Sequence, residues 1–294
     1  MDAGDLRVFE TVARLGGMNR AATELHTVQS NVTARIRLLE DELGTTLFQR
    51  NSRGVILTPS GRRLLPYAAR IASLLAEARR ATADDGDPKG PLAIGSLETT
   101  AGLRLPAILA EYAERYPEVD LELTTGTTCE LVEAVLGHRL EGAFVCGPVH
   151  HPEIDEQKVF REELVIVTAR AVRRLDDILG RRELKIVVFR TGCSYRQRLE
   201  SILAMRGVVW IRCLQFATLD GMLGCVGAGV GLTLLPKGIV AAAKDQGRIA
   251  VHEISSADAW VDTVFIRRHD AYASSALVAF LDLARDRLPV QIAA

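Results

Sequence analysis

Apolar positions near the start of the chain recur at helical spacing. Leu6, Phe9 and Val12 lie on one face, which predicts a helix that ends at a pair of glycines. The alanine-rich stretch 20–25 predicts a short second helix, with Asn19 as its cap. The opening of the chain is therefore expected to be helical.

A third helix is predicted over residues 28–43, because its apolar residues are spaced for a single face. These residues are Val32, Ile36, Leu39 and Leu43. The positions near its start are polar, and a glycine follows its last residue. Valine is a poor N-cap, so we expect Thr27 or Ser30, rather than Val28, to cap this helix.

Two short apolar strands, 46–50 and 55–57, flank a turn that ends in glycine, and this pattern predicts a hairpin, or wing. Thr58 and Pro59 then begin a helix over 59–83, about 37 Å long at 1.5 Å per residue. Its apolar residues repeat at heptad spacing: Leu64, Ala68, Ile71, Leu75 and Ala78. We expect this seam to form a dimeric coiled coil, because the flanking segments offer no obvious partner. Packing on its own domain is the alternative.

Residues 84–91 combine helix breakers with charge and predict a linker. From residue 92 onward, strand and helix patterns alternate, which predicts parallel sheets covered by helices. The predicted strands are 92–95, 120–124, 142–145, 164–168, 185–189, 209–214, 231–234 and 260–266. The predicted helices are 103–116, 129–137, 194–205, 219–226, 236–244 and 274–287.

A length of 294 residues allows two or three modules. The acidic opening lacks the apolar segment of a secretion signal. The most apolar run, 222–235, falls short of the roughly 20 residues that a membrane span needs. We therefore expect a cytoplasmic protein that does not engage a membrane. The net charge of −1 means that any nucleic-acid binding must come from local clusters of charge.

The helix over 28–43 has a polar edge that suits DNA. A helix fits the major groove, where Gln and Asn pair with adenine and Arg pairs with guanine. The candidate DNA-binding residues are Gln29, Ser30, Asn31, Thr33, Arg35 and Arg37, with Arg50 and Arg53 on the wing. The alternative is an amphipathic helix with a solvated polar face. The ordered set of helices, turn and wing favours DNA binding.

Residues 20–61 resemble the N-terminal signature of LysR-type transcriptional regulators. The matching positions include Ala21, Ala22, Leu25, Gln29, Val32, Ile36, Leu39, Glu40, Leu43, Gly44, Leu47, Phe48, Arg50, Leu57, Thr58, Pro59 and Gly61. The stretches 160–164 and 227–236 are similar to the family as well. The chain departs from the pattern at Met18 and Asn19, and at Val28, where the family often has a hydroxyl residue.

The resemblance implies an all-α winged helix-turn-helix with a long linker helix, followed by a two-lobed α/β domain like a periplasmic binding protein. The implied boundaries are 1–58 for DNA binding, 59–88 for the dimerisation helix and hinge, and 89–294 for effector binding. Lobe one would comprise 91–161 with 267–294, and lobe two 162–266. A protein of this kind binds double-stranded promoter DNA as a homodimer or homotetramer and is expected to contact RNA polymerase.

The resemblance also implies a small-molecule effector between the lobes. Independently, parallel sheets bind ligands beyond the C-terminal ends of their strands, close to helix N-termini. The candidate effector-binding residues at such ends are Ser96, Thr99, Thr100, Thr127, Thr128, Cys146, Gly147, Cys193 and Thr218. Hydroxyls and free amides suit a carboxylate, which Glu98 would oppose unless it points away. The alternative is that these hydroxyls only cap helices. We expect no cofactor or metal beyond this non-covalent effector.

Some features of the sequence also fit other functions. Cys129, Cys146 and Cys193 fall near strand ends and would suit a thiol-based redox or metal sensor, although small buried cysteines are common in cores. His150 and His151 would suit a metal, with an exposed turn as the alternative. A small-molecule carrier is opposed by the winged module, and an enzyme by the lack of a catalytic motif. The sequence therefore predicts an effector-controlled, sequence-specific transcription regulator rather than an enzyme.

Overall fold

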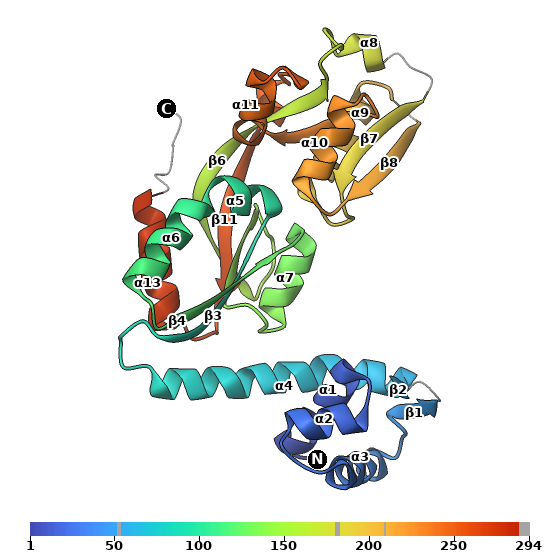
Figure 1. The fold of residues 1–294 in the computed structure, drawn as a ribbon, viewed down its shortest axis with the longest axis vertical. Coiled ribbons are helices and arrows are strands. Elements are labelled where there is room, and N and C mark those ends of the chain that lie inside the picture. The colour runs from blue at the N-terminus through green and yellow to red at the C-terminus, as the bar shows by residue number, and fades with distance from the viewer. Residues whose placement is uncertain (52–53, 180–182, 209, 288–294) are drawn as a thin grey trace. The chain divides into compact units, whose positions relative to one another are not determined.

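The computed structural model describes residues 1–51, 54–179, 183–208 and 210–287. The chain divides into two compact units, one formed mostly by residues 1–84 and the other mostly by the residues that follow (Figure 1). Within the described ranges, no helix combines the length and the apolar character needed to cross a membrane.

The N-terminal unit is a winged helix-turn-helix with a long helix after the wing. In chain order it contains α1 (Ala3–Leu15), α2 (Met18–Glu24), α3 (Gln29–Leu43), β1 (Phe48–Asn51), β2 (Gly54–Leu57) and α4 (Pro59–Ala83). β1 and β2 pair antiparallel. The prediction that Asn19 caps α2 is wrong: the extended backbone of Gly17 is the N-cap, and Met18 already lies in the helix with its side chain buried.

One apolar core joins these elements. Phe9 of α1 is fully buried, and its ring lies 5.3 Å from that of Phe48 in β1. The apolar stripe of α3 packs into the same core, as the spacing predicted. Ala68 of α4 is also fully buried there, with Leu64 and Ile71 packed against it. The expectation that the α4 seam lacks a partner within the chain is therefore wrong for its first half.

The second unit contains two lobes that share one sheet. Its strands are β3 (Gly90–Ser96), β4 (Val119–Thr125), β5 (Gly142–Cys146), β6 (Ile154–Ala169), β7 (Leu184–Phe189), β8 (Ile211–Phe216), β9 (Thr233–Pro236), β10 (Ile249–His252) and β11 (Trp260–Arg268). Its helices are α5 (Glu98–Leu103), α6 (Leu105–Arg115), α7 (Thr128–Leu136), α8 (Asp176–Leu179), α9 (Ser194–Met205), α10 (Leu219–Gly227), α11 (Lys237–Asp245), α12 (Ser256–Ala259) and α13 (Ser275–Arg287).

The main sheet is mixed, with the order β10-β6-β11-β5-β3-β4, and β9 also pairs with β6. The predicted parallel pairing holds for β3 with β4 and β5, and for β7 with β8. It does not hold for the two long strands, because β11 runs antiparallel to both β5 and β6. β6 leads from lobe one (β3–β5, α5–α7 and α13) to lobe two (β7–β10 and α8–α12), and β11 returns.

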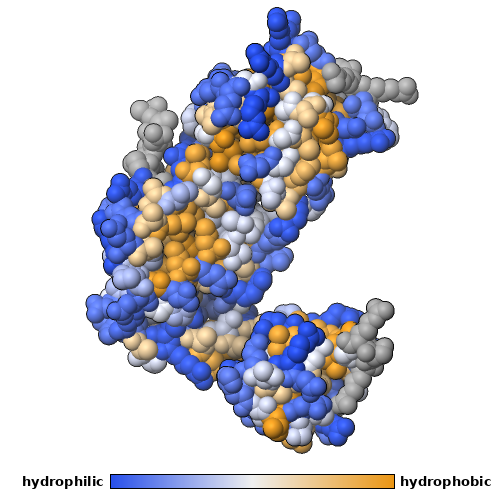
Figure 2. Space-filling model, in the orientation of Figure 1, coloured by the Kyte–Doolittle hydropathy of each residue, from blue (hydrophilic) through white to orange (hydrophobic). Residues whose placement is uncertain are grey.

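Each lobe has its own packing around this shared sheet. In lobe one, Phe144, Phe265 and Phe280 form edge-to-face contacts, and Tyr112 donates a hydrogen bond of 2.7 Å to the carbonyl of Ala276. In lobe two, Val165 and Val167 of β6 pack with residues of α10 and α11. On the surface drawn in Figure 2, hydrophobic residues gather over α6 and α13, where Val278 is exposed.

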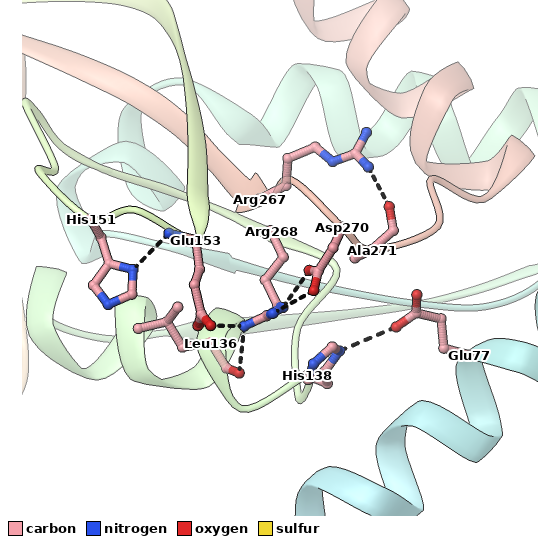
Figure 3. A network of polar contacts seen from close by, with 9 residues as sticks. All are labelled: Glu77, Leu136, His138, His151, Glu153, Arg267, Arg268, Asp270 and Ala271. Atoms are coloured by element: carbon pink, nitrogen blue, oxygen red, sulfur yellow. Dashed lines mark hydrogen bonds and ion pairs between the residues drawn. The ribbon is translucent and has the colours of Figure 1, made fainter.

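A buried arginine fixes the end of β11 in lobe one (Figure 3). Arg268 is only 2% exposed, and its guanidinium donates to Asp270 at 2.7 and 2.8 Å. The same group donates to Glu153 at 2.9 Å and to the carbonyl of Leu136 at 3.4 Å. Arg268 therefore ties the end of one crossing strand to the approach to the other and to the end of α7.

Candidate DNA-reading helix and inter-lobe pockets

The two faces of α3 differ sharply. Val32, Ile36 and Leu39 are buried in the core of the N-terminal unit. At the start of the helix, Gln29, Ser30 and Asn31 are exposed, and Arg37 is exposed one to two turns later. The residues predicted to reach base edges thus form a solvent-accessible polar edge on a helix whose position the core fixes.

The start of α3 carries no side-chain cap. Val28 is the N-cap residue in extended conformation, so the prediction that Thr27 or Ser30 caps the helix is wrong. The physical reason is local: the hydroxyl of Thr27 instead accepts a hydrogen bond of 2.9 Å from the Asn31 side chain. An uncapped helix N-terminus with a favourable dipole suits a DNA phosphate.

Two of the predicted contact residues face the protein instead. Arg35 donates hydrogen bonds to Asp5 at 2.8 Å and to Asp2 at 3.2 Å, both near the start of α1. The hydroxyl oxygen of Thr33 is buried and has no hydrogen-bond partner among the described residues. Arg35 therefore ties α3 to the start of α1, and Thr33 adjoins the core. Both differ in this from the exposed residues of the polar edge.

The wing is held against the helices by backbone contacts. The carboxylate of Glu40 in α3 accepts from the amides of Leu47 at 2.6 Å and Phe48 at 3.1 Å. Gly54 turns back so closely that a Cβ there would lie 2.6 Å from the carbonyl oxygen of Gly16. The backbone of Arg50 lies in β1, but its side chain and all of Arg53 fall outside the described residues.

A first pocket lies between the lobes and is small, with a volume of about 40 Å³. Lobe one lines it with Leu97, Glu98, Thr99, Thr125, Gly126 and Thr127, and lobe two with Phe189, Arg190, Cys193, Tyr195 and Ala217. The hydroxyls of Thr99 and Tyr195 lie 3.5 Å apart across the lobes. Burial raises the pKa of Tyr195 and keeps its phenol protonated.

A second, larger pocket also lies between the lobes, and the predicted effector-binding residues are divided between the two pockets. Thr128, Cys146 and Gly147 line it, whereas Thr99, Thr127 and Cys193 line the first pocket. The hydroxyl of Ser194 in lobe two donates to that of Thr128 in lobe one at 3.1 Å. Ser96, Thr100 and Thr218 line neither pocket: Ser96 and Thr100 are buried, and Thr218 is exposed at the start of α10.

The N-terminus of α7 is already occupied. The carboxylate of Glu130 accepts from the backbone amide of Thr127 at 2.8 Å and from its hydroxyl at 3.0 Å. These bonds hold the pKa of Glu130 below its ordinary value. Because the carboxylate of Glu130 already accepts both hydrogen bonds, Thr127 has less capacity to bind an external anion than the sequence predicted. Glu98, which was expected to oppose an anion if it faced the site, does line the first pocket.

Four residues that line the first pocket were not among the candidate effector-binding residues: Phe189, Arg190, Tyr195 and Ala217. Phe189 and Arg190 stand at the end of β7, where the strand-end rule that selected Thr127 would also have selected them. Ala217 follows β8 in the same way. Tyr195 gave no such signal, because it lies inside α9 and reaches the pocket only through the packing of the lobes.

The buried cysteines near the pockets are poor nucleophiles. Burial raises the pKa of Cys146 to about 11 and also raises the pKa of Cys193. A thiol with a raised pKa stays protonated, and the reactive form is the thiolate. Cys129 is exposed. Across the part of the chain that the structure describes, no group of three or more His, Cys, Asp or Glu residues is placed to hold a metal ion.

Comparisons with known proteins agree with this geometry. Residues 3–62 match the family of bacterial regulatory helix-turn-helix proteins of the lysR type, and residues 85–289 match the LysR substrate binding domain. The chain is 44% identical to the HTH-type transcriptional regulator GltR of Bacillus subtilis over 286 residues, 97% of each protein. It is 46% identical to the uncharacterized regulator YusT of the same organism, over 96% of this chain and 95% of that protein.

Solved structures share the fold along the whole chain. CbnR, a LysR family transcriptional regulator, superposes with a TM-score of 0.68 at 24% identity, covering 98% of this chain and 99% of that one. CbnR in complex with its target DNA gives a TM-score of 0.67, also at 24% identity, over 98% of this chain and all of that one. A full-length OxyR from Pseudomonas aeruginosa gives 0.68 at 19% identity, over 98% and 94% of the two chains. This chain, with its winged helix-turn-helix and two-lobed second unit, belongs to the LysR family of transcriptional regulators.

Proposed function

We propose that this protein binds specific promoter sequences through α3 and the wing, and that a small molecule in the first pocket controls its effect on transcription. The main support for this proposal is the exposed edge of Gln29, Ser30 and Asn31 on a helix whose opposite face is buried in the core. A helix of this build enters the major groove with its N-terminal residues at the base edges. The CbnR structure with its target DNA supports the same use of this fold.

Dimerisation through α4 completes the proposal. The second half of this helix leaves Leu74 and Leu75 more than 40% exposed, and Tyr67 is 68% exposed. Pairing of two copies along this face would bury these side chains and present two copies of α3 to successive turns of the duplex. Further pairing into a tetramer would use the second unit, and contact with RNA polymerase would follow from binding beside a promoter.

Control by a small molecule follows from the construction of the second unit. The lobes are joined by two crossing strands, β6 and β11, and both lobes contribute to the first pocket. A ligand that contacts both lobes favours the closed arrangement over the open one by the difference in its affinity for the two.

A footprint on the promoter beside the protein's own coding region tests this proposal. We expect protection of a roughly palindromic site at low salt, and a change in the protected pattern when fractionated metabolites are added. Gln29→Ala should weaken binding by about 10-fold or more, the cost of one bidentate base contact. Gln246→Ala, an exposed glutamine in the second unit, is the matched control and should bind normally. Absence of protection at low salt would refute the proposal.

A further inference from the structure

One carboxylate in the first pocket has no partner. Glu98 is the first residue of α5 and lines the pocket with its side chain half-buried. Among the described residues it makes no hydrogen bond and no ion pair. Apolar Leu97, Phe189 and Ala217 line the same pocket, together with hydroxyl-bearing residues such as Thr99 and Tyr195. An unpaired carboxylate that is partly withdrawn from water favours a cation beside it.

An opposite charge enters the pocket from the other lobe. Arg190 follows β7 of lobe two, and its only ion pair among the described residues is a long one, 3.9 Å to Glu130. Thr127 bonds the other oxygen of that carboxylate, and the 3.9 Å separation leaves the guanidinium room for a closer anion. Just beyond Arg190, the 12-residue helix α9 begins at Cys193 without a side-chain cap. Lobe two thus offers the pocket a guanidinium and a helix start, both of which favour an anion.

We propose that the effector is a zwitterion of the α-amino acid class with an apolar side chain. Its ammonium lies at Glu98 of lobe one, and its carboxylate lies at Arg190 of lobe two. The aromatic rings of Phe189 and Tyr195 favour both the cation and the apolar side chain. Because each charge is held by a different lobe, only a ligand that carries both would bridge the lobes. This inference rests on the proposed function of the first pocket and adds the chemistry of its ligand.

Neither charge alone satisfies the pocket. A simple carboxylate would find Arg190 but would leave Glu98 unpaired and repelled. A simple amine would pair with Glu98 but would face the guanidinium of Arg190. Leu97 and Phe189 give the pocket an aliphatic and an aromatic surface. We therefore expect a ligand with an apolar side chain rather than a second charged group.

Calorimetric titration of the full chain with the standard L-amino acids tests this assignment. Matched probes remove one charge at a time: isocaproate and isoamylamine for L-leucine, and hydrocinnamate and phenethylamine for L-phenylalanine. We expect at least one apolar amino acid to bind, and binding to weaken by about 10- to 100-fold when either charge is removed, as for the loss of a charged hydrogen bond.

The variant Glu98→Gln keeps the size of the side chain and removes its charge. It should weaken amino-acid binding at least 10-fold and erase the preference over the ammonium-free acid. Glu114→Gln, an exposed carboxylate on α6, is the matched control and should change neither. Thermal unfolding of both variants should match that of the unchanged chain, which excludes misfolding as the cause.

Three results would overturn the assignment: binding by no amino acid, equal binding of the ammonium-free acids, or unchanged affinity in Glu98→Gln. Each is distinguishable from failure of the proposed function, because protection of promoter DNA is first measured before any ligand is added. A chain that protects its promoter but binds no amino acid retains the regulator function and loses only this choice of effector.

Discussion

Two arginines of α3 should respond in opposite ways to replacement by alanine. Arg35 donates to Asp5 at 2.8 Å, with the two side chains 34% and 20% exposed. Arg37 is exposed and has no ion pair among the described residues. We therefore expect Arg35→Ala to lower the stability of the N-terminal unit and Arg37→Ala to weaken DNA binding.

The expected magnitudes follow from these environments. Removing one partner costs up to about 1 kcal/mol in an exposed ion pair and about 3–5 kcal/mol in a buried one, so Arg35→Ala in this partly exposed pair should cost about 1–1.5 kcal/mol. With a typical urea dependence, this loss lowers the unfolding midpoint by about 0.5–1 M. Removing Arg37 should instead reduce the slope of log affinity against log salt by about 1 for each DNA-bound protomer.

Urea unfolding followed by circular dichroism measures the first effect, and fluorescence anisotropy with a promoter duplex over a range of salt measures the second. A double-mutant cycle with Asp5→Ala isolates the pair, because the capping bond that Asp5 also accepts from the Asp2 amide is lost equally with and without Arg35 and cancels. The reasoning is refuted if Arg35→Ala reduces the salt slope as Arg37→Ala does while leaving the urea midpoint unchanged.

Three further outcomes are expected. Gly61→Ala should destabilise the N-terminal unit by about 3 kcal/mol, because the new Cβ would lie 2.3 Å from the carbonyl oxygen of Leu47; in thermal unfolding, Gly102→Ala, which meets no atom within 4 Å, is the control that should not destabilise. Arg161 and Lys158 lower the pKa of Asp262 to about 2, from 3.8. This carboxylate should therefore contribute about 1–2 kcal/mol above pH 4 that is lost as the pH falls toward 2, and urea midpoints of Asp262→Asn should lack that loss. In native protein, dithiobisnitrobenzoic acid should react quickly with the exposed Cys129 and should react with Cys146 and Cys193 only after unfolding, because these two are buried and burial raises their pKa; a fast thiol that disappears in Cys193→Ser would indicate a redox sensor.

The N-terminal unit was largely predictable because its signals are local. The apolar spacing of α3 and the pair Thr58 and Pro59 each act within one or two turns of helix, and the structure places both as expected. Thr58 accepts from the amide of Gly61 at 3.0 Å. The uncapped start at Val28 was missed because Asn31, a helical turn away, competes for the hydroxyl of Thr27.

The second unit was less predictable because its pairing is not local. The first half of β6 is mostly exposed and lacks an apolar run, so only its buried second half was recognised. Its antiparallel neighbour β11 lies about a hundred residues away in the chain. In the first pocket, one feature could be predicted from the sequence and another could not. The spacing of Thr127 and Glu130 is that of a capping box and was readable from the sequence, whereas the presence of Glu98 and Arg190 in the lining of one pocket depends on how the lobes pack.

Site-directed cleavage tests most directly whether the N-terminal edge of α3 lies against base pairs. A copper–phenanthroline group attached at Gln29→Cys, with Cys129 and Cys213 replaced by serine, should cut promoter DNA inside the protected site. The account predicts two centres of cleavage separated by about one helical turn or a multiple of it, one for each copy of α3. Tight binding with no cleavage from this position, but efficient cleavage from a probe on the second unit, would contradict it.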